Sequence, residues 1–258
     1  INFKISQEIR GLKDLQEQLN EKLGQATGKK KEVEKEHLDL KARKSIVLDE
    51  ESDRKNLLAQ TKNQEKIYQQ QIDELAKQQL AIADEVEELE RQLRSQTDPN
   101  TLPTARPGVL MWPVQGRLSQ NWGATSFARS RQGYRGKWHN GIDIAGPIGT
   151  PILSSEKGII LAVGDQDKYC RRGAYGKYVV IKHNNNLTTL YAHLSQFNAA
   201  VGNIINRGDV IGYMGRTGYA TGSHLHFTVY DSKTFGMRSS NSCGLMPSGG
   251  DLNPLSYL

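Results

Sequence analysis

Two stripes of apolar residues run along the first 96 residues at the spacing of a long α-helix. Within residues 5–23, and again within residues 72–93, apolar side chains recur at alternating intervals of four and three between charged residues. Gln16 and Gln79 are the polar interruptions. Such stripes predict a coiled coil, in which an occasional polar residue helps to set the register. We therefore expect residues 1–96 to form a coiled-coil helical arm.

The stripe weakens between about residues 24 and 66, and we expect the arm to reverse direction there. Residues 24–28 are one candidate turn, because each of the two glycines in this segment would cost about 1 kcal/mol in a helix relative to alanine. Residues 48–53 are the other, and a reversal there would give two segments of nearly equal length. The pattern fits a homo-oligomer of arms as well as a hairpin within one chain.

A proline-rich linker, residues 97–108, follows the arm. Proline-rich segments are extended and semi-rigid, so this segment is a domain boundary. Residues 109–258 then contain short alternating runs separated by turn signals, which predict an all-β domain of antiparallel sheets. The clearest runs are residues 158–163, 177–183, 187–192, 208–214 and 224–230. The expected fold is an α-helical coiled coil plus an all-β domain.

Charge divides at the same boundary. Residues 1–96 carry 18 Lys and Arg against 20 Asp and Glu, and the rest of the chain carries 16 against 8, which gives net charges of −2 and +8. A basic surface concentrates polyanions, and a basic cluster lies just before residue 139. Its members are Arg129, Arg131, Arg135 and Lys137. No motif for binding nucleic acid accompanies the charge, so we predict no nucleic-acid partner.

The segment GSHLHFTVY, residues 222–230, contains two histidines two positions apart. Side chains two apart in a strand project from the same face, so His224 and His226 would share one face. Leu225 and its apolar neighbours would occupy the other face, toward the core. The histidine pair suits a metal site or a proton relay, and a pair of solvent-facing strand histidines is the alternative.

Two other segments carry chemistry of the same kind. HNGID places His139 and Asp143 four apart around Gly141. Zinc in hydrolases typically takes three protein ligands and keeps one position for water, which loses a proton near neutral pH. These two residues and one strand histidine would supply such a set. LYAHL places His193 at a strand end, where it could serve as a general base or stabilise an oxyanion, or could merely cap the strand.

HNGID, LYAHL and GSHLHF, in this order, resemble the motifs of the lysostaphin-type, or LytM-like, zinc metallopeptidases over roughly residues 108–232. The resemblance implies an endopeptidase that hydrolyses peptide bonds of bacterial peptidoglycan with Zn²⁺ as cofactor. It further implies that residues 109–258 are a LytM-like domain. The implied metal ligands are His139, Asp143 and His226, and the implied catalytic residues are His193 and His224.

Two further residues are candidates by the same resemblance. Some members have an upstream asparagine as a fourth ligand, for which Asn121 is a candidate, and an active-site tyrosine, for which Tyr134 is a candidate. The basic domain would be attracted to anionic wall polymers.

The arm resembles that of EnvC-like division proteins, which bind a membrane division complex and activate cell-wall amidases through a degenerate domain. A non-enzymatic activator is therefore the alternative function. The complete set of five site residues argues against it, and the arm could instead gate a competent site.

The implied location is the cell envelope, either periplasmic or extracellular. The sequence contains no run of about 18 apolar residues, so no transmembrane helix is predicted. The chain begins at Ile1, and we expect a processed form without its export signal. Because disulfides persist outside the cytoplasm, we expect Cys170 and Cys243 to be bridged rather than to be two free thiols. No CxxC pair is present, which disfavours a cysteine zinc site.

Overall fold

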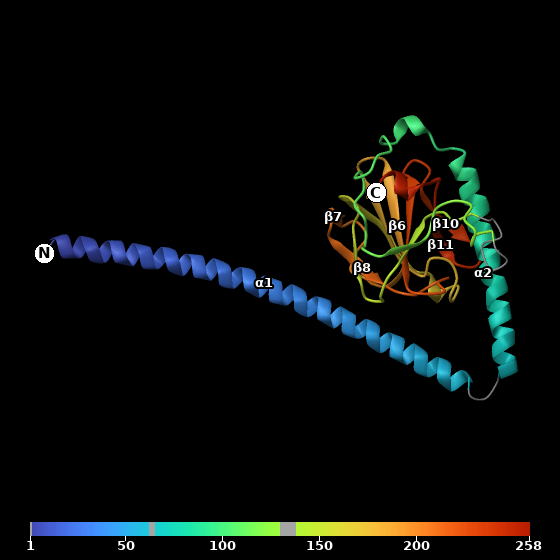
Figure 1. The fold of residues 1–258 in the computed structure, drawn as a ribbon, viewed down its shortest axis with the longest axis horizontal. Coiled ribbons are helices and arrows are strands. Elements are labelled where there is room, and N and C mark those ends of the chain that lie inside the picture. The colour runs from blue at the N-terminus through green and yellow to red at the C-terminus, as the bar shows by residue number, and fades with distance from the viewer. Residues whose placement is uncertain (1, 62–64, 130–137) are drawn as a thin grey trace. The chain divides into compact units, whose positions relative to one another are not determined.

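The computed structural model describes the chain except residue 1, residues 62–64 and residues 130–137 (Figure 1). Helix α1 (Asn2–Thr61) and helix α2 (Glu65–Arg94) precede the strands, and three short 3-10 helices lie at Pro99–Thr101, Gln166–Lys168 and Pro254–Ser256. The strands are β1 (Arg117–Gln120), β2 (Ile142–Ala145), β3 (Pro151–Leu153), β4 (Gly158–Asp165), β5 (Lys177–His183), β6 (Leu187–Phe197), β7 (Ile204–Ile205), β8 (Val210–Met214), β9 (His224–Asp231), β10 (Gly236–Ser240), β11 (Gly244–Ser248) and β12 (Asp251–Leu252).

Helix α1 runs unbroken through both segments in which we predicted a reversal. Residues 24–28 and residues 48–53 are helical, so both predicted turns are wrong. Two isolated glycines cost about 1 kcal/mol each, and good helix formers such as Lys, Glu and Leu on either side offset that cost. Among the described residues, no helix is both long and apolar enough to span a membrane.

The antiparallel β-sheet is confirmed. Its order is β1-β2-β9-β6-β5-β4-β7, with β3, β8 and β12 joined to it off this path, and β10 pairs with β11 separately. All of these pairings are antiparallel. The runs predicted from alternation correspond to β4, β5, β6, β8 and β9.

The two faces of β9 are used as the alternation predicts. Leu225, Phe227 and Val229 are fully buried in the main core. His226 and Tyr230 point to the opposite face, where Tyr230 belongs to a second cluster that includes Ile82 of α2. One face of the sheet therefore packs the core, and the other carries the polar site beneath α2.

Helix α2 packs against the β domain. Residues 56–258 form one compact unit and residues 1–55 another. Ile82 and Leu93 are buried, and Arg94 pairs with Asp251 of β12. The apolar stripe that we interpreted as a coiled-coil seam thus serves, in α2, partly as a packing face for the β domain. Hydrophobic burial of this kind is the usual source of helix stability in proteins.

The predicted disulfide between Cys170 and Cys243 is confirmed. It joins the loop that precedes β5 to the turn between β10 and β11, next to Ile82. The bridge therefore fixes part of the surface on which α2 rests.

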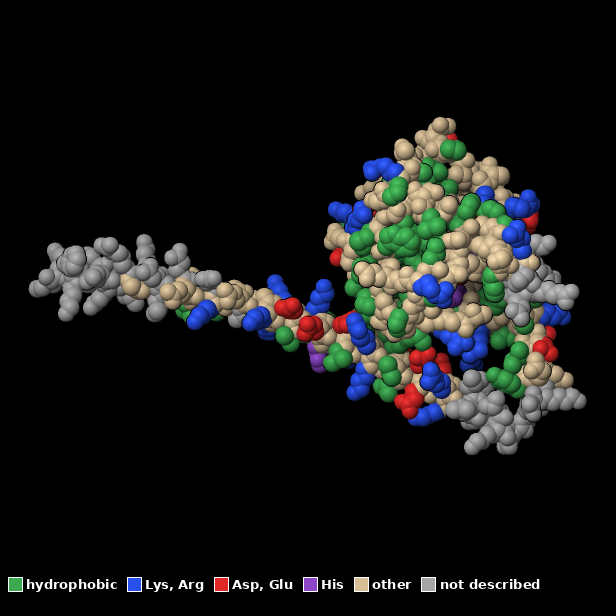
Figure 2. Space-filling model, in the orientation of Figure 1, with side chains coloured by type: hydrophobic (Ala, Val, Ile, Leu, Met, Phe, Trp, Pro, Cys, Tyr) green, Lys and Arg blue, Asp and Glu red, His purple; other side chains and the backbone are tan. Residues whose placement is uncertain are grey.

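The predicted basic cluster is described only at Arg129, because Arg131, Arg135 and Lys137 lie outside the described residues. On the face of the β domain drawn in Figure 2, the described Lys and Arg side chains lie mostly around the edges of an apolar area. A basic patch before residue 139 stays a prediction.

Candidate metal centre

The register of two strands brings the predicted ligands together. β2 and β9 are antiparallel, and Asp143 is paired directly with His226. His139 lies just before β2 and is held by a two-way backbone pairing with Gly123. Gly141 lies so close to the Phe227 carbonyl that a Cβ there would be only 2.4 Å from it. A glycine is therefore required between the two ligands on this segment.

The ligand atoms of His139, Asp143 and His226 form a small triangle. His139 Nε2 lies 3.0 Å from His226 Nδ1, which lies 2.9 Å from Asp143 Oδ1, and the third side is 3.2 Å. Atoms bound at 2.0–2.2 Å in a tetrahedral site lie roughly 3.3–3.6 Å apart. All three residues are buried, so the donor set and its spacing fit Zn²⁺ after a shift of a few tenths of an ångström.

The remaining ring nitrogens are held by neighbouring oxygens. His139 Nδ1–H donates to the Asn121 carbonyl at 2.8 Å, and His226 Nε2 lies 2.9 Å from Thr228 Oγ1. Such outer hydrogen bonds fix the ring orientation and direct the other nitrogen to a metal. Asn121, our candidate for a fourth ligand, contributes its backbone carbonyl here, and its side chain is exposed. Tyr134 lies outside the described residues.

Electrostatics favour the metal-binding forms of Asp143 and His226, and oppose that of His139. Burial would raise the pKa of Asp143, but the charge and hydrogen bond of His139 outweigh it and hold that pKa well below its usual range. Burial lowers the pKa of His226 to about 4. The charge and hydrogen bond of Asp143 overcome burial to raise the pKa of His139. Metal binding would therefore displace a proton from the His139–Asp143 pair.

His193 and His224 lie beside the triangle. Their ring centroids are 4.7 Å apart, and the His193 ring is 5.7 Å from that of His226. His193 Nδ1–H donates to the Thr217 carbonyl at 2.8 Å, so its Nε2 carries a lone pair. Burial, and then the neighbouring His224 and His226, hold the pKa of His193 well below its usual range. His193 also has φ +61°, an uncommon conformation for a residue other than glycine that is often found at functional sites.

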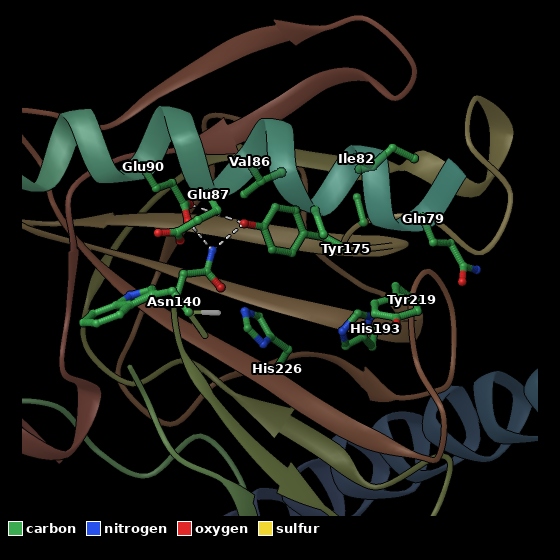
Figure 3. A pocket seen from close by; sticks show the side chains of 13 residues that line it. Gln79, Ile82, Val86, Glu87, Glu90, Asn140, Tyr175, His193, Tyr219 and His226 are labelled. Carbon is green, nitrogen blue, oxygen red and sulfur yellow. Dashed lines mark hydrogen bonds between the residues drawn. The ribbon is translucent and has the colours of Figure 1, made fainter. Parts of the chain in front are cut away.

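The groove around this site consists of two pockets that share Tyr219, and we call the pocket that α2 lines the covered half and the pocket without α2 residues the open half. The open half is a pocket of about 320 Å³, which Asp143, His224 and Tyr219 help to line. The covered half lies beneath α2 and keeps a cavity of only about 70 Å³, lined by His193, His226 and Tyr219 among others (Figure 3). Ligand sites commonly measure 300–1,000 Å³, so the covered half is too small for a peptide in this arrangement.

Sequence reasoning missed the residues that close the covered half. Glu90 of α2 is completely buried against Asn140, Tyr175 and Tyr230 of the β domain. One signal was present, because Glu90 lies four residues after Val86 on the apolar face of the helix. A charged residue on that face indicates a specific polar partner.

The chain is similar in sequence to known peptidases over the segment that contains these residues. Residues 137–237 match peptidase family M23. The chain is 49% identical over 89 residues to the DD-carboxypeptidase/endopeptidase Mpg of Neisseria meningitidis, covering 34% of this chain and 19% of the relative. It is 43% identical over 92 residues to the peptidoglycan DD-endopeptidase ShyA of Vibrio cholerae, covering 35% and 20%. A solved structure of a zinc-containing peptidase from Vibrio cholerae matches 53% of this chain and 37% of that chain, at 27% identity and a TM-score of 0.41. The matched parts span about a fifth of the two curated relatives.

Proposed function

We propose that this chain, whose residues 137–237 are a domain of peptidase family M23, is a zinc-dependent endopeptidase that hydrolyses peptide bonds of bacterial peptidoglycan. The observation that carries the proposal is the buried triangle of His139, Asp143 and His226 at the wall of an open groove. The relative named as a peptidoglycan DD-endopeptidase supports this substrate class.

Each of the five site residues has a role that fits its surroundings. His139, Asp143 and His226 hold Zn²⁺, which when bound supplies a Lewis acid and lowers the pKa of a bound water. His193 Nε2 accepts a proton from the attacking water, because its Nδ1 is committed to Thr217. His224 lines the open half of the groove and balances the negative charge that develops on the carbonyl oxygen.

Replacing His224 by alanine should leave zinc bound and slow hydrolysis of sacculi by roughly 10²- to 10³-fold, the range for loss of one group that stabilises an oxyanion. His224 lies outside the metal-binding triangle, so zinc content should not change. Both quantities are measured on one sample, as metal per chain and as soluble fragments released. The control is His37→Ala in the exposed part of α1. A His224→Ala variant that retains zinc and digests sacculi at the parent rate would refute the assigned role.

We further propose that α2 gates the active site. Ile82, Val86 and Glu90 line the covered half of the groove, so a peptide that spans both halves needs α2 to move away (Figure 3). All five predicted site residues are present and gathered at one place, which favours a gated enzyme over a degenerate, non-enzymatic activator.

Rising pH should weaken the docking of α2. Burial, together with the negative charge of Asp251, raises the pKa of Glu90 well above its usual range, although Asn140 and Tyr230 donate hydrogen bonds to it and Arg94 lies nearby. The carboxyl is thus protonated more readily when α2 is docked. Docking is therefore strongest below the ordinary pKa of about 4.5, and this contribution is lost as pH rises through the raised value.

Hydrogen exchange of α2, corrected for the intrinsic effect of pH on exchange, measures this dependence. In the parent, the amide protons of α2 should lose protection as pH rises from about 4.5 through the raised pKa of Glu90. In Glu90→Gln, whose side chain cannot ionise, the protection of α2 should change less with pH. Tyr175 and Tyr230, whose hydroxyls contact Glu90, have raised pKa values and stay neutral in the same pH range. Burial also raises the pKa of Glu87 on α2, but Glu87 is present in both proteins, so the difference between the two profiles reports Glu90. Equal profiles for the two proteins would show that Glu90 does not control docking.

The location and partners that we propose follow from the fold. The disulfide supports an oxidising compartment, in the periplasm or outside the cell. Leu19, Leu23 and Val47 of α1 are exposed and apolar, which supports association of the arm. We propose that the arm forms a coiled coil with another copy or binds a membrane division complex.

A further inference from the structure

Glu90 is held by three neutral hydrogen-bond donors of the β domain. Asn140 Nδ2 donates to one carboxyl oxygen at 2.7 Å, and the hydroxyl of Tyr230 donates to the other at 2.9 Å. The hydroxyl of Tyr175 lies 3.4 Å from this second oxygen, a contact that Figure 3 shows. The side chain of Glu90 is completely buried. A carboxyl group thus fills a site built for it.

The three donors belong to the catalytic groove rather than to the helix. Asn140 directly follows the predicted ligand His139, and Tyr230 lies on the same face of β9 as His226. The ring of Tyr175 is centred 5.8 Å from that of His226. One residue of extended peptide spans roughly 3.5 Å. The 5.8 Å between the rings of Tyr175 and His226 therefore corresponds to about two residues of extended peptide.

The donors also hold one another in place. Asn140 Nδ2 donates to the Tyr175 hydroxyl at 2.7 Å, and the hydroxyls of Tyr175 and Tyr230 are 3.4 Å apart. Buried donors without an acceptor carry a large desolvation penalty, so a vacated site would favour another carboxyl group in the place of Glu90. The site is thus arranged before a ligand arrives.

We propose that Asn140, Tyr175 and Tyr230 form a subsite that binds a free carboxyl group of the substrate peptide next to the scissile bond, and that Glu90 occupies this subsite as a mimic of the substrate. This inference rests on the proposed endopeptidase function. The carboxylate belongs either to an acidic side chain or to a chain terminus, and the experiment separates these two sources.

The first test is binding to the full chain with Glu90→Ala, which vacates the subsite. Acetate should bind this variant saturably and at least tenfold more tightly than acetamide, measured by ligand-observed NMR with chemical shifts of α2 and β9 as a second readout. The double variant Glu90→Ala with Tyr230→Phe should lose about tenfold in acetate affinity, because the hydrogen bond from the Tyr230 hydroxyl is absent. Equal binding of acetate and acetamide would overturn the proposal.

Two control variants isolate the subsite. Glu85→Ala removes another α2 carboxylate, one that accepts hydrogen bonds from Ser240 and Asn241 away from the groove. It leaves Glu90 in place and should not bind acetate. Glu90→Gln keeps the subsite filled by a side chain of the same shape and should not bind acetate either. Acetate binding by either control at the affinity of Glu90→Ala would place the anion elsewhere and overturn the assignment.

The second test is turnover by full-chain Glu90→Ala that also carries Ile82→Glu, a substitution in the buried face of α2 that should release the helix from the groove. The substrates are peptidoglycan peptides in three forms: unmodified, amidated at the acidic side chain, or amidated at the terminus. One amidation should lower kcat/KM by about 10- to 100-fold, and the amidation that does so identifies the source of the carboxylate. Adding Tyr230→Phe should remove most of this preference, chiefly by raising KM for the unmodified peptide. Turnover of all three forms at equal rates would overturn the subsite and leave the endopeptidase function intact. Acetate binding without turnover of any form would support the subsite while refuting the endopeptidase function.

Discussion

Replacing His226 by alanine should remove the bound zinc and lower the hydrolysis of sacculi by at least about 10³-fold, the scale on which loss of a central catalytic group acts. His226 Nδ1 supplies one corner of the triangle, at 2.9 and 3.0 Å from the other two ligand atoms. Two remaining ligands hold zinc poorly, because catalytic sites generally use three. Metal per chain after dialysis and fragment release from sacculi measure the two effects.

His183 offers a matched control for that substitution. It is also a buried strand histidine, and it contacts the Lys157 carbonyl and Thr189 rather than the site. His183→Ala should lower the free energy of unfolding while the folded protein retains zinc and activity. Full zinc occupancy in His226→Ala would contradict the proposed ligand set.

Replacing Ile82 by glutamate should raise the rate of hydrolysis by about 30-fold or more. Ile82 is only 4% exposed, and its burial stabilises the docked helix by roughly 2–3 kcal/mol. Loss of that free energy raises the fraction of molecules in which α2 has left the groove by about 30-fold when the docked state dominates in the parent. Initial rates on sacculi and hydrogen exchange of α2 report activity and docking together.

Ile72→Glu is the matched control, because Ile72 lies on the same helix and is 39% exposed. It should change neither the rate nor the protection of α2 near the groove. If the Ile82→Glu variant releases α2 and retains zinc but hydrolyses sacculi no faster than the parent, α2 does not gate the active site.

The residues of the candidate site could be selected from the sequence because they occupy regular local patterns. The period of two in β9 placed His226 opposite Phe227, and the structure keeps that division of faces. The spacing of His139 and Asp143 around Gly141 marked a second segment. The sequence did not reveal the register of β2 against β9, which pairs Asp143 with His226, because pairing depends on contacts distant along the chain.

The helical half shows what local patterns leave open. An apolar stripe that includes Ile82, Val86 and Leu93 fits a coiled-coil seam and a face packed on a sheet equally well, since both need the same spacing. Glu90 distinguishes the two, but its partners come from segments far along the chain, so their convergence was invisible in the sequence. The two glycines led us to predict a turn at residues 24–28, where α1 is continuous. The continuity of a helix depends on the whole segment and not on single residues.

The most direct test of the central claim is mass spectrometry of the products released from purified sacculi, with zinc analysis of the same protein sample. We expect about one zinc per chain and fragments with a newly cut peptide bond, which His224→Ala releases at least about 100-fold more slowly. Intact cross-linked peptides with the parent, or release of the same fragments by His224→Ala at the parent rate, would contradict the proposed function.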